Sequence, residues 1–153
     1  MAKEMGLEVS GLAELQKSFD KLSDNKVLYP LVYEGTGVVA DEMKRQLSSL
    51  KTSKGYGTKQ HKRYVNEFDK KVLIDAMGVA PIKERNSINS KVGFDGYYLD
   101  SKGKNKPVPL LANSVNAGTS FMEKQAFIDA TARATRNQVF QAMKEQADKI
   151  IKV

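Results

Sequence analysis

The chain has 153 residues, of which 41% are hydrophobic and 28% are charged, as expected for a globular protein with one core. It contains no cysteine, which excludes disulfides, thiolate catalysis and cysteine-ligated metal centres. No apolar run approaches the roughly 20 residues that are needed to cross a bilayer, so we expect no membrane partner. These properties predict a single domain over residues 1–153.

The positive charge is concentrated in one segment of the chain. Nine lysines and arginines lie between residues 44 and 71, against one glutamate and one aspartate. This excess equals the net charge of the whole chain, +7, so the remainder is balanced. A basic segment of this kind can bind phosphate or an acidic partner, or it can simply be solvated.

Alternating residues at 7–9 predict a short first strand, and the apolar spacing at 11–22 predicts a short helix. A longer helix is predicted over about residues 26–50, because apolar residues recur there every three or four positions. Gly35 and Gly37 each weaken a helix by about 1 kcal/mol relative to alanine. Either another backbone packs closely at these glycines, or the helix breaks there.

Residues 51–64 contain two glycines and many cations without any apolar period, which predicts an exposed, flexible basic loop. Cations bind a phosphate backbone and tyrosines can stack on bases, so the loop is a candidate for contact with a partner or with DNA. Composition favours a solvated loop over this role. The candidate residues are Lys51, Lys54, Tyr56, Lys59, Lys62 and Arg63.

The residues that usually support catalysis are sparse. His61 is the only histidine, and its cationic neighbours make it a poor general base, so we interpret it as a solvated loop residue. Asp95 and Asp100 flank an aromatic segment but have no third ligand at a metal-binding spacing. Residues 55–59 lack the spacing and the preceding strand of a phosphate-binding loop. We therefore expect no enzymatic activity, no metal and no cofactor.

In the second half of the chain, apolar residues at 65–77 predict a short helix that ends at Gly78. Residues 90–99 are strand formers interrupted by glycine, and residues 100–107 are predicted to form a turn or flexible loop. Residues 108–117 fit a short helix and a strand equally well. A final helix is predicted from residue 124 or 127 to 152, with Phe140 and Ile151 broadening its apolar stripe.

A Gly-Thr-Ser turn at residues 118–120 precedes this final helix. The apolar residues that follow the turn either plug the end of the sheet, which composition favours, or present an apolar patch to a partner. The second possibility gives a candidate assembly interface, which consists of Thr119, Phe121, Met122 and Phe127.

Several of these segments together resemble one family. They are residues 91–94 (Lys-Val-Gly-Phe), 112–117, 118–120 and 126–130, and in the first half residues 9–15 and 37–44. They are similar to the head–tail joining, tail-completion or minor tail proteins of long-tailed phages. The chain departs from that pattern where Asn116 and Ala117 replace Glu and an aromatic, and where Gln125 and Ala126 replace Arg-Pro. The lysine-rich loop also replaces the family's Pro-x-x-Thr-Gly-x-Leu.

The resemblance implies an α+β fold in which a twisted antiparallel sheet packs against a long helix, with a short N-terminal and a long C-terminal helix. It implies a non-enzymatic structural virion protein that joins the tail to the head, or completes the head-proximal end of the tail tube, as a ring often of six subunits. The implied partners are copies of itself, the tail tube protein, connector or neck proteins, and genomic DNA in the channel. The implied location is the virion, after assembly in the host cytoplasm. The residues leave open a small basic nucleic-acid-binding accessory protein as the alternative.

Overall fold

The computed structural model describes residues 17, 20, 23–84 and 88–152. The helices are α2 (Asn25–Ser48), α3 (Glu67–Ala76), α4 (Val108–Ala117) and α5 (Phe127–Lys152); the strands are β1 (Met77–Val79), β2 (Lys83–Glu84), β3 (Ile88–Asn89), β4 (Val92–Phe94), β5 (Tyr97–Leu99) and β6 (Asn105–Pro107). The predicted α+β class is confirmed. The strand predicted at 7–9 and the helix predicted at 11–22 lie outside the described residues, apart from Lys17 and Asp20.

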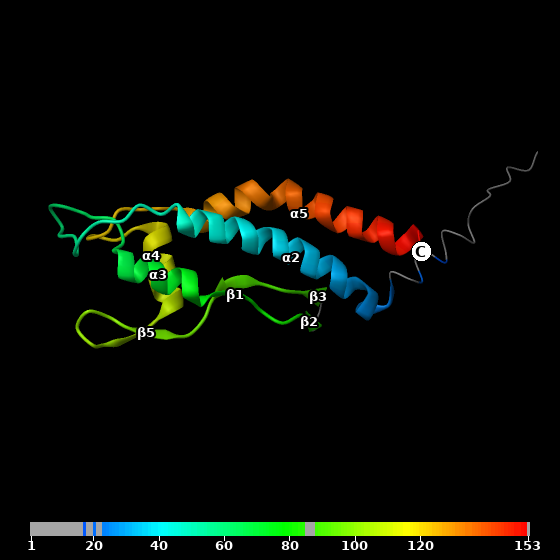
Figure 1. Cartoon of the computed structure of the whole chain (residues 1–153), viewed down its shortest axis with the longest axis horizontal. Coiled ribbons are helices and arrows are strands. Elements are labelled where there is room, and N and C mark those ends of the chain that lie inside the picture. Colours follow the sequence, from blue (N-terminus) through cyan, green and yellow to red (C-terminus); the bar gives the residue numbers. More distant parts are fainter. Residues whose placement is uncertain (1–16, 18–19, 21–22, 85–87, 153) are drawn as a thin grey trace, which may run out of the picture.

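The two long helices, α2 and α5, lie side by side and run in opposite directions along the long axis of the molecule (Figure 1). Met43 and Leu47 of α2 are buried, and so are Phe127, Thr131 and Thr135 of α5. Each threonine hydroxyl donates to the carbonyl four residues earlier, at 2.8 Å. Because these hydroxyls are satisfied within the helix, threonine is tolerated in the core. Both long helices were predicted from the sequence.

Helix α2 continues through Gly35 and Gly37 without a break. A Cβ atom added to Gly35 would lie 3.0 Å from the sulfur of Met143 and 3.2 Å from a methyl of Val139, both on α5. The absence of a side chain at Gly35 therefore lets the two helices approach closely. A Cβ atom at Gly37 would meet nothing within 4 Å, so close packing is present at Gly35 alone, and it comes from the side chains of α5 rather than from another backbone.

The strands form three two-stranded antiparallel pairs in the described part of the chain, rather than one continuous sheet. The β1–β4 and β2–β3 pairs belong to one long, bent hairpin. Its register shifts by one residue, because Val79 pairs with Val92 whereas Lys83 pairs with Asn89. Pro81 lies at this step, and proline has no amide hydrogen to donate to a ladder. The third pair, β5–β6, is a separate hairpin.

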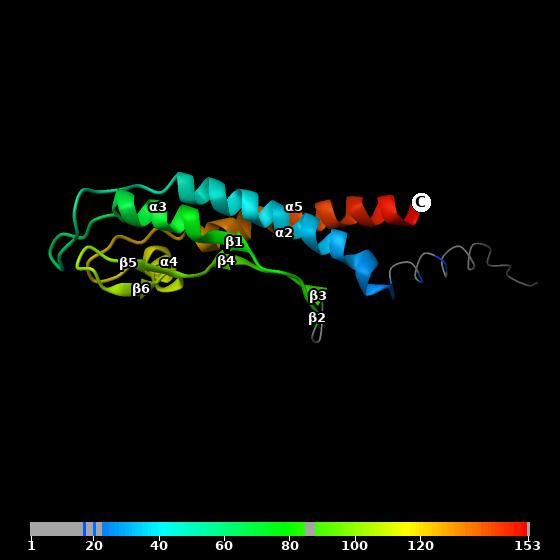
Figure 2. The ribbon, with the colours of Figure 1, turned by 60° about the horizontal axis from the view of Figure 1, so that its bottom comes forward.

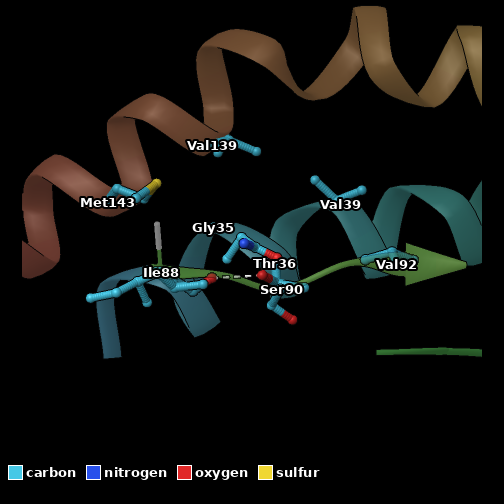
Figure 3. A pocket seen from close by; sticks show the side chains of 10 residues that line it. Gly35, Thr36, Val39, Ile88, Ser90, Val92, Val139 and Met143 are labelled. Carbon is cyan, nitrogen blue, oxygen red and sulfur yellow. Dashed lines mark hydrogen bonds between the residues drawn. The ribbon is translucent and has the colours of Figure 1, made fainter. Parts of the chain in front are cut away.

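The long hairpin packs on α2 through β1, β4 and β3, and β2 lies farther from the helices (Figure 2). Where it crosses the helix pair, a cavity of about 300 Å³ remains between Gly35 and Val39 of α2, Val92 of β4 and Met143 of α5 (Figure 3). The hydroxyl of Thr36, which also lines the cavity, donates to a main-chain carbonyl of α2 at 2.6 Å. Among the described residues, no ionisable side chain lines this cavity, so we interpret it as a packing gap.

Residues 108–117 form helix α4, which settles the ambiguity left by the sequence. Four of its residues, at positions 108, 111, 112 and 115, are buried at helical spacing. The buried apolar core comprises Met43, Leu47, Leu50, Val65, Leu73, Val108, Leu111, Ala112, Val115 and Phe127. These residues come from the C-terminal half of α2, the first turn of α5 and the elements between them. The core is therefore concentrated toward one end of an elongated molecule.

None of the described helices is both long enough and apolar enough to cross a membrane.

Candidate interaction surface

The basic loop 51–64 is joined to the segment before α5. The amide of Arg63 donates to the carbonyl of Phe121 at 3.2 Å, and the amide of Glu123 donates to the carbonyl of Arg63 at 2.9 Å. These two bonds form a short parallel bridge between Arg63 and Met122. The structure thus brings together the two segments that the sequence singled out separately.

Gln125 makes a second attachment between the same segments. Its side-chain oxygen accepts from the amide of Lys51 at 2.8 Å, and its side-chain nitrogen donates to the carbonyl of Lys51 at 2.9 Å. The amide of Gln125 also donates to the carbonyl of Val115 in α4, at 2.9 Å. This residue stands where the resembled family has arginine. Sequence reasoning missed its role, because a lone glutamine carries no pattern.

Gly57 lies at the closest approach of the loop to the segment before α5. A Cβ atom at this position would fall 1.9 Å from the carbonyl oxygen of Phe121 and 2.7 Å from the amide nitrogen of Arg63. Both are main-chain atoms, which cannot turn aside as a flexible side chain can. Glycine is therefore required here, because any side chain would separate the two segments.

Most of the loop's candidate cations face solvent. Lys54, Lys59 and Lys62 are exposed and, in the described part of the chain, form no ion pair. The guanidinium of Arg63 donates to the carbonyl of Lys54. The ammonium of Lys51 lies 5.7 Å from the ring centre of Tyr64, a cation–π distance. The exposure agrees with the sequence-based expectation, and the flexibility of the loop stays a prediction.

The four candidate interface residues have different surroundings. Thr119 holds the turn, since its hydroxyl accepts from the amides of Phe121 at 3.1 Å and Met122 at 3.0 Å. Met122 packs partly buried against the core. Phe127 is 2% exposed, and its ring meets that of Phe94 edge-on with 5.9 Å between centroids.

Phe127 therefore belongs to the core and is not available to a partner, which corrects its assignment to the candidate interface. The reason is that α5 begins at this residue and its first turn faces the core. Phe121 is 50% exposed. Phe127 and Met122 pack into the protein and do not form an apolar surface patch. Phe121 remains exposed and can still contact a partner.

A cavity of about 480 Å³ opens between the basic loop, α3 and the β5–β6 hairpin. Tyr56 and Gly57 line it from the loop, Tyr98 and Lys106 from the hairpin, and Phe121 from the segment before α5. Two carboxylates, those of Asp69 and Asp100, also line it. Sequence reasoning found Asp100 but did not single out Asp69.

Asp69 is positioned by the start of α3. Asn66 caps this helix: its side-chain oxygen accepts from the amide of Asp69 at 2.7 Å, and its side-chain nitrogen donates to one Asp69 oxygen at 3.2 Å. The other carboxylate oxygen is buried and has no hydrogen-bond partner in the described part of the chain. Burial raises the pKa of Asp69 above its ordinary value, because the charged form loses hydration.

Asp100 has the opposite environment. Its carboxylate accepts from the amides of Lys104 and Lys102, each at 2.9 Å, and pairs with the ammonium of Lys106 at 2.9 Å. The amide of Lys104, followed by Lys106, lowers the pKa of Asp100 to about 2. Burial, followed by the nearby charge of Asp69, raises the pKa of Tyr98 to about 12.

The lining of this cavity suits the binding of a ligand. Tyrosine and phenylalanine side chains line it beside Lys102 and beside Lys106, which is paired with Asp100. His61 lies in a tight turn closed by the amide of Thr58 and does not line the cavity. Among the described residues, no three histidine, aspartate or glutamate side chains come close enough to hold a metal ion.

Large apolar side chains are also exposed away from this cavity. They are Tyr33, Phe68, Val79, Tyr97, Leu99, Leu110, Phe140 and Ile151. The apolar patterns predicted buried faces for Phe68, Phe140 and Ile151, which the structure corrects. On α5 the buried face follows Thr131 and Thr135, and Phe140 lies outside it and is 71% exposed.

Comparisons with protein-family models, with curated proteins and with solved structures find no match to this chain.

Proposed function

We propose that this chain is a non-enzymatic structural protein of a long-tailed phage virion, which joins the tail to the head or completes the head-proximal end of the tail tube by forming a ring. The sequence resemblance to head–tail joining and tail-completion proteins supports the proposal. One structural observation carries it further: in the described part of the chain, ten large apolar side chains are exposed, as many as the ten hydrophobic residues in the buried core.

Scattered exposed apolar residues are normal, but a chain that exposes as many of them as it buries hides little of its apolar surface when isolated, which favours assembly. The core is small and lies toward one end, so subunits that pack together gain burial that the isolated chain lacks. Among the described residues, the two most exposed large apolar side chains are Phe140 of α5, at 71%, and Tyr97 of β5, at 70%. They belong to different elements. A head-to-tail ring requires two different surfaces on each subunit, and these two elements supply them.

Phe121 is the remaining exposed member of the candidate interface predicted from the sequence. It adjoins the basic loop, whose attachment through Arg63 places both segments at the same end of the molecule (Figure 1). In the proposed ring, this end contacts the layer above or below, which is the tail tube protein or a connector or neck protein.

The test is the mass of the particle, measured by light scattering over a range of concentrations. The wild-type chain should assemble as concentration rises, and moderate salt should change this little, because the contacts are apolar. Phe140→Asp and Tyr97→Asp should each keep the chain monomeric, since a charge in an apolar contact is costly to desolvate.

Gln138→Glu is the matched control. Gln138 is exposed on α5 but does not share the face of Phe140, because residues two positions apart on a helix do not face each other, and it receives the same charge. It should assemble as the wild type does. A wild-type chain that stays monomeric at every concentration would overturn the proposal. If all variants assembled equally, Phe140 and Tyr97 would not lie in the interface.

A further inference from the structure

A second lysine-rich turn lies opposite the basic loop. It joins β5 to β6, with lysines at every second position: 102, 104 and 106. Asp100 organises this turn, because one carboxylate oxygen accepts two of its amides and the other pairs with Lys106. In the described part of the chain, Lys102 and Lys104 are exposed and form no ion pair. The turn therefore presents free cations on a defined backbone.

The two lysine-rich segments lie more than 35 residues apart in the sequence but flank one cavity. Figure 1 shows both at the end of the molecule opposite the C-terminus. Tyr56 comes from the first segment and Lys102 from the second, and both line the 480 Å³ cavity. This end is therefore a concave surface with a basic rim, which the sequence alone did not predict.

The two carboxylates in the cavity do not offset the positive charge of the rim. The negative charge of Asp100 is compensated by the ammonium of Lys106 and by the amides of its own turn. Asp69 is only 5% exposed, so its carboxylate contributes little to the surface that meets solvent. The charges that meet solvent at this end are mainly those of lysines, so the surface attracts anions.

Aromatic side chains decide which anion fits. Tyr56 is 56% exposed and Phe121 is 50% exposed, and both line the cavity. Nucleobases stack on exposed aromatic faces, whereas the carboxylates of an acidic polypeptide do not. A duplex presents phosphates but keeps its bases stacked internally, so its bases cannot reach these rings.

We propose that this end of the molecule binds single-stranded nucleic acid, with the lysines of both segments contacting phosphates and a base stacking on Tyr56 and Phe121. In the proposed ring the same end contacts the neighbouring layer, so this inference concerns the chain before that contact forms, and it does not depend on ring assembly.

The test is fluorescence anisotropy with a labelled oligothymidylate and with a DNA hairpin duplex carrying the same number of phosphates, over a salt series. The wild type should bind the oligothymidylate more tightly than the duplex, and rising salt should release it. Lys102→Gln with Lys104→Gln should weaken binding by roughly tenfold and reduce the log–log salt slope by about 1.4, which corresponds to two lost contacts. Tyr56→Leu should weaken binding roughly fivefold or more.

The control is Lys26→Gln with Lys149→Gln, which removes the same charge from exposed positions on the long helices. This double variant should bind as the wild type does. An equal loss in the control would show that only net charge matters, and would overturn the site. Duplex binding as tight as that of the single strand, or no effect of Tyr56→Leu, would overturn the stacking. Equal displacement by polyglutamate would assign the surface to an acidic protein instead.

Discussion

The joint between the basic loop and the segment before α5 can be broken by adding one methyl group. In Gly57→Ala, the new Cβ would lie 1.9 Å from the Phe121 carbonyl oxygen and 2.7 Å from the Arg63 nitrogen. Since these are main-chain atoms, the loop or the facing segment must move. The movement breaks the two hydrogen bonds that link Arg63 to Phe121 and Glu123.

Each of these hydrogen bonds contributes about 0.5–1.5 kcal/mol net, so their loss costs about 1–3 kcal/mol. Alanine restricts the unfolded chain more than glycine does, which offsets about 0.4–1 kcal/mol. We therefore expect Gly57→Ala to destabilise the protein by about 1–2 kcal/mol. For a chain of this length, each kcal/mol lowers the unfolding temperature by about 2–4 °C.

The assay is thermal unfolding followed by circular dichroism, with hydrogen exchange at the Arg63 and Glu123 amides as a local readout. Gly37→Ala is the matched control, because its Cβ would meet nothing within 4 Å. It should stabilise α2 by up to about 1 kcal/mol and raise the unfolding temperature. If Gly57→Ala is as stable as the wild type and both amides stay protected, the described joint is absent.

Three further substitutions test the core and the two carboxylates. Phe127→Ala should cost about 3–5 kcal/mol in urea unfolding, because it empties a buried ring site against Phe94, and a loss below about 1 kcal/mol would remove Phe127 from the core. The lowered pKa of Asp100, about 2 against an ordinary 3.8, means that its carboxylate stabilises the fold above about pH 4 and that this contribution is lost as pH falls toward 2. Asp100→Asn should therefore be less stable than the wild type at neutral pH and lose less stability over that acid range; parallel urea-unfolding profiles would contradict this. The pKa of Asp69 is raised, so its contribution is fully present below pH 3.8 and is lost as pH rises through the folded-state value. Asp69→Asn should gain stability relative to the wild type between acid and neutral pH, and a constant difference across that range would refute the assignment.

The long helices could be predicted because their apolar period repeats over many turns. Helix α4 was ambiguous, since a ten-residue, mostly apolar segment fits a strand as well, although Val108, Leu111 and Val115 already lie at helical spacing. On α5, counting apolar residues misplaced Phe140 and Ile151. The buried positions include Thr131 and Thr135, whose hydroxyls bond within the helix and so need no partner outside it.

The candidate surface could be predicted only in parts. The sequence identified the basic loop and Phe121, but the hydrogen bonds that join their segments are largely between main-chain atoms, which leave no pattern of side chains. In the sequence, Gly57 was the one sign of this close approach, but it could not be distinguished from an ordinary loop glycine. The lysines at 102–106 were visible in the sequence, yet their place beside the cavity depends on how the β5–β6 hairpin packs.

The proposed function requires that this chain closes into a ring. Negative-stain electron microscopy of the concentrated wild-type protein, with image classification, makes such a ring visible. We expect closed rings of one size with a central opening, because a head-to-tail contact with the correct rotation returns to its starting subunit. Monomers at every concentration, or open filaments without closure, would contradict it.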